Sequence, residues 1–132
     1  MVTFENPLLD FGIKFLYYLA PVENLRSIFK RGIMNKRRVE NLNLNYADYS
    51  DRDVQTIREE KSLHSFVPLF LNTRNAMTYR YQKSGVDFVI LRLMSDLVTQ
   101  YDCKVSDRIA ACRFAKILDL TAQSLKLIGV KD

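Results

Sequence analysis

The sequence predicts an α+β fold, a small mixed sheet with flanking helices. Short runs rich in strand-forming residues are separated by segments with helical spacing, and their order is too irregular for a doubly wound sheet. The composition is that of a folded protein, with 48% apolar and 27% charged residues. A length of 132 residues suits one domain, so we expect a single domain over residues 1–132.

The first element that we expect is a buried strand over the aromatic and aliphatic run Phe15–Leu19. Pro21 suits the first position of a following helix, where its missing N–H has no partner to lose. This helix should end at Gly32, which can adopt positive φ without strain. We expect its inward face to hold the apolar residues that share one side of a helix, Val22, Leu25, Ile28 and Phe29.

The next part of the chain is polar. From Asn35 to Asn45 no apolar period is sustained, and we expect a loop. Ser50 followed by Asp53 is an N-cap signal, and the helix that it opens should run from Asp51 to about Lys61. This helix is strongly charged apart from a thin apolar stripe, which indicates a surface helix.

The second half begins with the apolar run Phe66–Leu71, which predicts a strand with Pro68 at its start or at a sheet edge. Asn75 is placed to cap a short helix after a polar turn. Val86–Leu93 is the clearest strand in the chain. Two serines, Ser95 and Ser106, are further N-cap candidates. A helix after the second would align on one side Ile109, Cys112, either Ala115 or Lys116, and then either Leu118 or Ile117.

Charge, hydropathy and cysteine content exclude several classes of protein. The chain has 20 Lys and Arg against 15 Asp and Glu, a net charge of +5, which permits a nucleic-acid partner without requiring one. It has no run of the roughly 18 apolar residues that a membrane span needs, and we expect no membrane association. Cys103 and Cys112 fit a reducing, cytoplasmic compartment better than a disulfide framework. With His64 as the single histidine, we expect no metal site.

Three blocks of sequence carry a more specific signal. The first runs from Phe15 to Gly32 and includes Asn24 and Leu25, and the second surrounds Arg58. The third is the most specific because several unlike residues occur in it at fixed spacing: His64, Val67, Pro68, Phe70, Asn72, Arg74, Asn75, Met77 and Tyr79. In this order the blocks resemble the DarT family, bacterial toxins that transfer ADP-ribose from NAD to thymidine in single-stranded DNA.

The resemblance implies an ADP-ribosyltransferase-like fold that binds NAD as co-substrate. Arg58 would be the active-site cation, and the strand Leu16–Ala20 would line the nicotinamide end of the site. The NAD-binding residues would be Tyr17, Tyr18, Asn24, His64, Asn72, Arg74, Met77 and Tyr79. The implied partners are single-stranded DNA and a macrodomain antitoxin that removes the modification.

Transfer from NAD breaks the bond between nicotinamide and ribose, and positive charge develops on the ribose. Enzymes of this kind usually use one glutamate for that charge and for the incoming base. An aromatic platform and an arginine fork would complete the site, from Tyr17 or Tyr18 and from Arg58 or Arg74. One departure from the family is Tyr18, which stands where the family has a histidine.

The family glutamate lies in a downstream apolar strand, and no glutamate occurs from Tyr101 onward. We therefore expect transfer to be crippled or absent, the 132 residues being either part of a longer enzyme or a shortened relative. A sheet without that strand would expose an edge or favour self-association.

Each of these residues also has an ordinary structural interpretation. Tyr17 and Tyr18 are adjacent on a strand, so only one of them can face a cleft. Arg58 alone would be a solvated helix residue, and His64 a hydrogen-bonded structural histidine. Met77 and Tyr79 would be core residues.

Another class of function remains open, a module that binds single-stranded nucleic acid without reacting. Phe66, Phe70 and Tyr79 would stack bases in such a module. The phosphates would contact four basic residues, Lys36, Arg37, Arg38 and Arg80. A degenerate remnant with neither activity is the third alternative.

Overall fold

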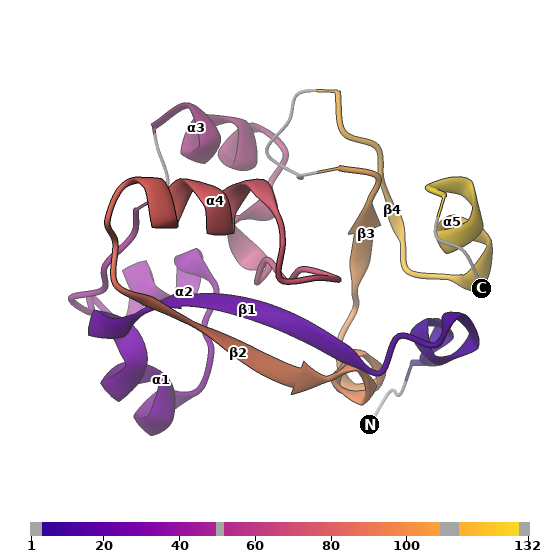
Figure 1. The fold of residues 1–132 in the computed structure, drawn as a ribbon, viewed down its shortest axis with the longest axis horizontal. Helices are drawn as coiled ribbons and strands as arrows, with labels where there is room; N and C mark the ends of the chain where they lie inside the picture. Colours follow the sequence, from indigo (N-terminus) through magenta and orange to yellow (C-terminus); the bar gives the residue numbers. More distant parts are fainter. Residues whose placement is uncertain (1–3, 50–51, 109–113, 130–132) are drawn as a thin grey trace. The chain divides into compact units, whose positions relative to one another are not determined.

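The computed structural model describes residues 4–49, 52–108 and 114–129. It confirms the α+β class, with two small antiparallel sheets and several short helices (Figure 1). The chain clusters into two compact units. One is Tyr17–Arg92, and the other joins Met1–Leu16 to Leu93–Asp132. The single domain over residues 1–132 stays a prediction. No helix in the described ranges is both long and apolar enough to cross a bilayer.

The sheet that concerns the site pairs β1 (Phe15–Pro21) with β2 (Phe88–Met94), as Figure 1 shows. Both predicted strands are confirmed. Burial alternates along β1, with Leu16, Tyr18 and Ala20 buried, because successive side chains of a strand point to opposite faces.

A 3₁₀ turn, Val22–Asn24, follows β1 and leads into α1 (Leu25–Arg31). The helix ends at Gly32 with φ of 82°, as predicted. Pro21 was wrongly assigned to the helix: it is the last residue of β1, because Val22 N still donates to Asp87 O at 3.0 Å and keeps the chain extended.

The predicted inward face of α1 is also partly wrong. Ile28 is buried, but Val22 is 44% exposed and Phe29 is 79% exposed. The 3₁₀ turn advances three residues per turn instead of 3.6, so Val22 falls out of line with the helical stripe. Phe29 lies about 100° around the helix from Ile28 and points to the surface.

The segment predicted as a loop contains a helix, α2 (Lys36–Asn41). Asn35 caps it by accepting a hydrogen bond from Arg38 N at 2.8 Å. An apolar period could not reveal α2, because a helix of six residues with one apolar member has no stripe. The next helix, α3 (Arg52–Glu60), agrees with the prediction, although its expected cap Ser50 and first residue Asp51 lie outside the described residues.

After α3, a 3₁₀ turn covers Leu63–Ser65 and is called η3 here. The predicted strand Phe66–Leu71 is wrong, because Phe70 alone pairs, in an isolated antiparallel bridge with Tyr17. Pro68 cannot donate to a ladder, which limits the pairing of this run. The helix α4 (Ala76–Lys83) follows, and Asn75 caps it as predicted by accepting from Thr78 N at 2.9 Å.

In the other unit, β3 (Lys104–Ser106) pairs antiparallel with β4 (Ile117–Asp119), and α5 covers Ala122–Leu127 (Figure 1). The helix predicted after Ser106 is therefore wrong, since Ser106 belongs to β3 and pairs with Ile117, the first residue of β4. Ile109 and Cys112 lie outside the described residues.

Ser95 is likewise not a helix cap, because it is the first residue of the 3₁₀ helix Ser95–Gln100. Its hydroxyl accepts a hydrogen bond from Asn6 Nδ2 at 3.2 Å. This bond places a buried serine where the sequence pattern suggests a cap.

Candidate functional site

Two residues that the resemblance assigns to the site, Tyr18 on β1 and Arg58 on α3, lie in one interior cluster. Tyr18 is 9% exposed, and burial raises its pKa far above the usual value, with Tyr46, Tyr81 and Asp48 adding to the effect. Burial lowers the pKa of Arg58, and the nearby Asp48 and Tyr18 partly offset this. We call Tyr18, Tyr46, Asp48, Arg58 and Tyr81 the tyrosine–arginine cluster.

The Arg58 guanidinium is held by backbone oxygens. Its Nη2 lies 3.4 Å from both Leu63 O and Phe66 O, at the two ends of η3. Its Nε is buried and has no hydrogen-bond partner. Because an arginine remains protonated, the cluster contains a fixed positive charge with an unused donor.

Aromatic edges pack around Tyr81. Its ring centroid lies 6.0 Å from that of Tyr49 and 5.7 Å from that of Phe88, and both pairs meet edge to face. Burial raises the pKa of Tyr81 to about 12. The cluster is thus an apolar, aromatic environment around a few polar atoms.

The loop 43–49 supplies Tyr46 and Asp48 to this cluster and is held by Asn24. The Asn24 amide donates to Ala47 O and accepts from Ala47 N, both at 2.8 Å, and is only 2% exposed. Tyr49 also donates to Glu23. Ala47 uses one donor and the acceptor of this amide, and the expected contact between Asn24 and NAD stays a prediction.

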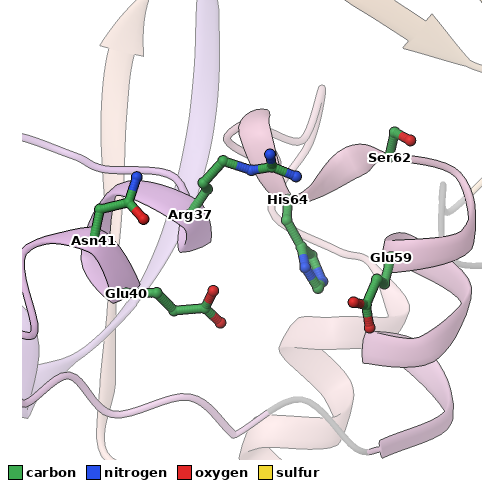
Figure 2. A pocket seen from close by; sticks show the side chains of 6 residues that line it. All are labelled: Arg37, Glu40, Asn41, Glu59, Ser62 and His64. Carbon is green, nitrogen blue, oxygen red and sulfur yellow. The ribbon is translucent and has the colours of Figure 1, made fainter.

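A polar cavity of about 340 Å³ lies beside η3 (Figure 2). It brings His64, an expected NAD-binding residue, together with Arg37, an expected DNA contact. The other four lining residues were not predicted as site residues: Glu40, Asn41, Glu59 and Ser62. Had α2 been predicted, the spacing of Arg37, Glu40 and Asn41 on one side of a helix would have signalled a shared face.

The remaining expected NAD-binding residues are not gathered around Tyr18. Tyr17 alternates to the other face of β1, and its backbone pairs with Phe70. Asn72 and Arg74 are exposed, and Met77 is half-buried. Tyr79 is 64% exposed, which rules out its alternative interpretation as a core residue.

The four expected DNA contacts also separate. Lys36 Nζ donates to Gln55 Oε1 at 2.7 Å and lies 3.7 Å from Asp48 Oδ2, so it is already engaged. Arg37 and Arg38 are both exposed, but Arg37 lines the polar cavity and Arg38 does not, and Arg80 is half-buried. Of the basic run on α2, Arg38 is therefore the residue best placed for a phosphate.

The described parts of the chain contain no group of three or more His, Cys, Asp or Glu residues placed to hold a metal ion together. Cys103 is free and half-buried, and burial raises the pKa of its thiol. A raised pKa disfavours the reactive thiolate, so this thiol is poorly suited to act as a nucleophile. Cys112 lies outside the described residues.

Comparison with known proteins gives a family and one relative. A family model described as "ssDNA thymidine ADP-ribosyltransferase, DarT" matches residues 17–129. A "DNA ADP-ribosyl transferase-DNA ADP-ribosyl glycohydrolase fusion protein" from Thermosipho africanus is 26% identical over 128 residues, covering 89% of this chain and 33% of the relative. The chain thus spans about a third of the length of that relative. No solved structure matches.

Proposed function

This chain belongs to the DarT family of single-stranded-DNA thymidine ADP-ribosyltransferases, and we propose that it binds NAD and takes part in transferring ADP-ribose to thymidine in DNA. The family match over residues 17–129 supports the proposal and confirms the resemblance seen in the sequence. The relative's name supports DNA as the acceptor.

The pairing of Tyr18 with Arg58 in the tyrosine–arginine cluster carries the proposal. In the reaction, the bond between ribose and nicotinamide breaks, nicotinamide leaves with the electron pair, and an atom of thymidine bonds to the ribose and loses its proton. The unused Nε–H of Arg58 would hold an oxygen of the dinucleotide. Tyr18 would supply the aromatic surface for nicotinamide, and the low-polarity surroundings would strengthen both contacts.

A carboxylate is needed to accept the proton that thymidine loses and to stabilise the positive charge on the ribose. The family glutamate belongs to a downstream strand, and residues 101–132 contain no glutamate. We therefore propose that residues 1–132 bind NAD. Their transfer of ADP-ribose to DNA should be weak or absent.

We further propose that the protein is the toxin of a toxin–antitoxin pair in the cytoplasm, with a macrodomain antitoxin as partner. The name of the relative joins a DNA ADP-ribosyl transferase to a DNA ADP-ribosyl glycohydrolase. A fusion of this kind supports a partnership between an activity that adds the modification and one that removes it.

The test is NAD binding, measured by thermal shift and by amide NMR of Tyr18, Arg58 and residues 72–79. Wild-type protein should bind, and Arg58→Lys should bind at least about tenfold more weakly, because lysine has no Nε–H donor in that position. The matched control is Arg52→Lys, on the same helix but exposed. No response of the wild type to NAD, or equal effects of the two substitutions, would contradict the proposal.

Transfer is tested separately with labelled NAD and two oligonucleotides that differ only in having or lacking thymine. Label on the thymine-containing strand alone would show transfer, and strong transfer would contradict the expected weakness of residues 1–132. If the wild type transfers label and Arg58→Lys transfers it at the same rate, the role proposed for Arg58 is wrong.

Binding of single-stranded nucleic acid without transfer is the second candidate function. Tyr79 favours it: its ring is 64% exposed, and Lys83 Nζ lies 6.0 Å from the ring centroid. An exposed aromatic ring beside a cation suits base stacking next to a phosphate. A gel shift that weakens with salt, without label transfer, would support this candidate.

A further inference from the structure

The polar cavity has walls that are fixed by bonds outside it. Asn35 Nδ2 donates to Ser65 O at 2.8 Å and joins α2 to η3. Lys36 donates to Gln55 at 2.7 Å and joins α2 to α3, and Arg58 joins α3 to the backbone of η3. The frame is therefore held in place without using any of the side chains that line the cavity.

Those lining side chains are all polar. Among the described residues, no side-chain hydrogen bond or ion pair joins any two of the six: Arg37, Glu40, Asn41, Glu59, Ser62 and His64. His64 Nε2 is itself buried without a hydrogen-bond partner, an arrangement that costs free energy. Figure 2 shows the His64 ring pointing into the space between Glu40 and Glu59.

Charge limits what can bind there. The two carboxylates outnumber the one guanidinium, so a phosphate would be repelled. Carboxylates accept hydrogen bonds only, and they favour a ligand rich in N–H or O–H groups. Asn41 and Arg37 donate, and they favour a ligand that also carries ring nitrogens or carbonyl oxygens. A volume of about 340 Å³ suits a ligand of nucleoside size.

We propose that this cavity binds a nucleobase with an exocyclic amino group. The amino group would donate to Glu40 or Glu59, as amino groups of bases do to carboxylates, and Asn41 or Arg37 would donate to the ring nitrogens. The inference rests on the proposed function only for the source of the base, which is the adenosine of NAD or a base of the DNA strand.

Adenosine and inosine form the matched test, because inosine has an oxygen in place of the exocyclic amine. Titration of the whole 132-residue chain, followed by NMR of the His64 and Asn41 signals, should show adenosine binding at least about tenfold more tightly. Inorganic phosphate should leave these signals unchanged. Equal affinity for the two nucleosides, no binding of adenosine, or a response to phosphate would each overturn the inference.

Two substitutions test the carboxylates, Glu40→Gln and Glu59→Gln. At least one should weaken adenosine binding about tenfold, since glutamine loses the negative charge and replaces one accepting oxygen with a donor. Both glutamates are exposed on short helices. The melting temperatures of the two variants show whether the fold is kept. The control is Asp53→Asn, which makes the same charge change at the other end of α3. Unchanged adenosine affinity in both glutamine variants would overturn the inference.

The same variants separate the two sources of the base and the two proposals. Weaker NAD binding with unchanged oligonucleotide binding would identify the adenosine of NAD, and the reverse would identify DNA. Adenosine binding that depends on Glu40 or Glu59, without any NAD binding, would support the cavity and contradict the proposed function. NAD binding that depends on Arg58 but on neither glutamate, with no adenosine binding, would support the function and overturn the cavity.

Discussion

Asn24 shows how one buried amide can control a site that it does not face. Its two hydrogen bonds to Ala47 fix loop 43–49, and this loop brings Tyr46 and Asp48 to the tyrosine–arginine cluster. An amide can satisfy a backbone N–H and C=O together, because it has a donor and an acceptor side by side. Glu23, the preceding residue, accepts from Tyr49 at the end of the same loop.

We predict that Asn24→Ala lowers the free energy of unfolding by about 2–3 kcal/mol, because both Ala47 groups lose a buried partner. The loss should be measured by urea denaturation, with amide exchange at Ala47 reporting the loop directly. Asn45→Ala, in the same loop but exposed, is the control and should change stability by less than about 0.5 kcal/mol. Equal stability of the two variants would show that the two hydrogen bonds between Asn24 and Ala47 do not stabilise the fold.

The buried hydroxyl of Tyr81 makes the stability of the protein depend on pH in the alkaline range. Its pKa is raised from 10.0 to about 12 by burial, so the unfolded chain releases this proton at a lower pH than the folded chain. The stabilisation is complete below pH 10 and is lost as the pH rises toward about 12. We predict that the free energy of unfolding falls over that range and falls less steeply in Tyr81→Phe. Denaturation at several alkaline pH values checks this, and parallel curves for the two proteins would contradict it.

Arg58 and Tyr18 could be predicted as site residues because both occur in the blocks that resemble the family. The structure places these two residues in one cluster. Glu40 and Glu59 were not predicted, because they belong to separate helices and become neighbours only when α2, α3 and η3 meet. Asn24 matches the family motif, but a motif does not tell whether an amide binds a ligand or a backbone.

At the scale of elements, the long apolar signals were predicted and the short polar ones were not. The strands β1 and β2 have runs of apolar residues, and the cap of α4 is an asparagine at the expected place. The helix α2 has no apolar stripe, and its main signal is Asn35. In 66–71 the pattern predicts a strand, but Pro68 and the use of the Phe66 carbonyl by Arg58 leave only one bridge.

Asn35 is predicted to matter for both α2 and the polar cavity. Its oxygen caps the helix and its nitrogen holds Ser65, so Asn35→Ala should lower the free energy of unfolding by about 1–2 kcal/mol. It should also weaken adenosine binding, because α2 carries Arg37, Glu40 and Asn41. The control is Asn75→Ala, which removes the cap of α4 and should lower stability while leaving adenosine binding unchanged. Thermal melts and nucleoside titrations together distinguish a cavity effect from general destabilisation.

At the scale of the whole molecule, the net charge of +5 is too small to identify a nucleic-acid partner by itself. What matters is which basic groups are available. Lys36 is engaged by Gln55 and Asp48, whereas Arg38, two residues later on α2, is exposed. The same formal charge can therefore have different effects on binding at the two positions.

We predict that Arg38→Gln reduces the salt dependence of single-stranded DNA binding, and that Lys36→Gln does not. Each phosphate contact on a single strand contributes a slope of roughly −0.7 to log K against log salt concentration, so losing one contact should change the slope by about that amount. Both substitutions remove one positive charge, so a purely long-range effect would change both slopes equally. Titrations of a thymine-rich oligonucleotide at several salt concentrations measure the slopes. Equal slopes for the two variants would mean that the contacts of Lys36 with α3 and loop 43–49 do not keep it from the DNA.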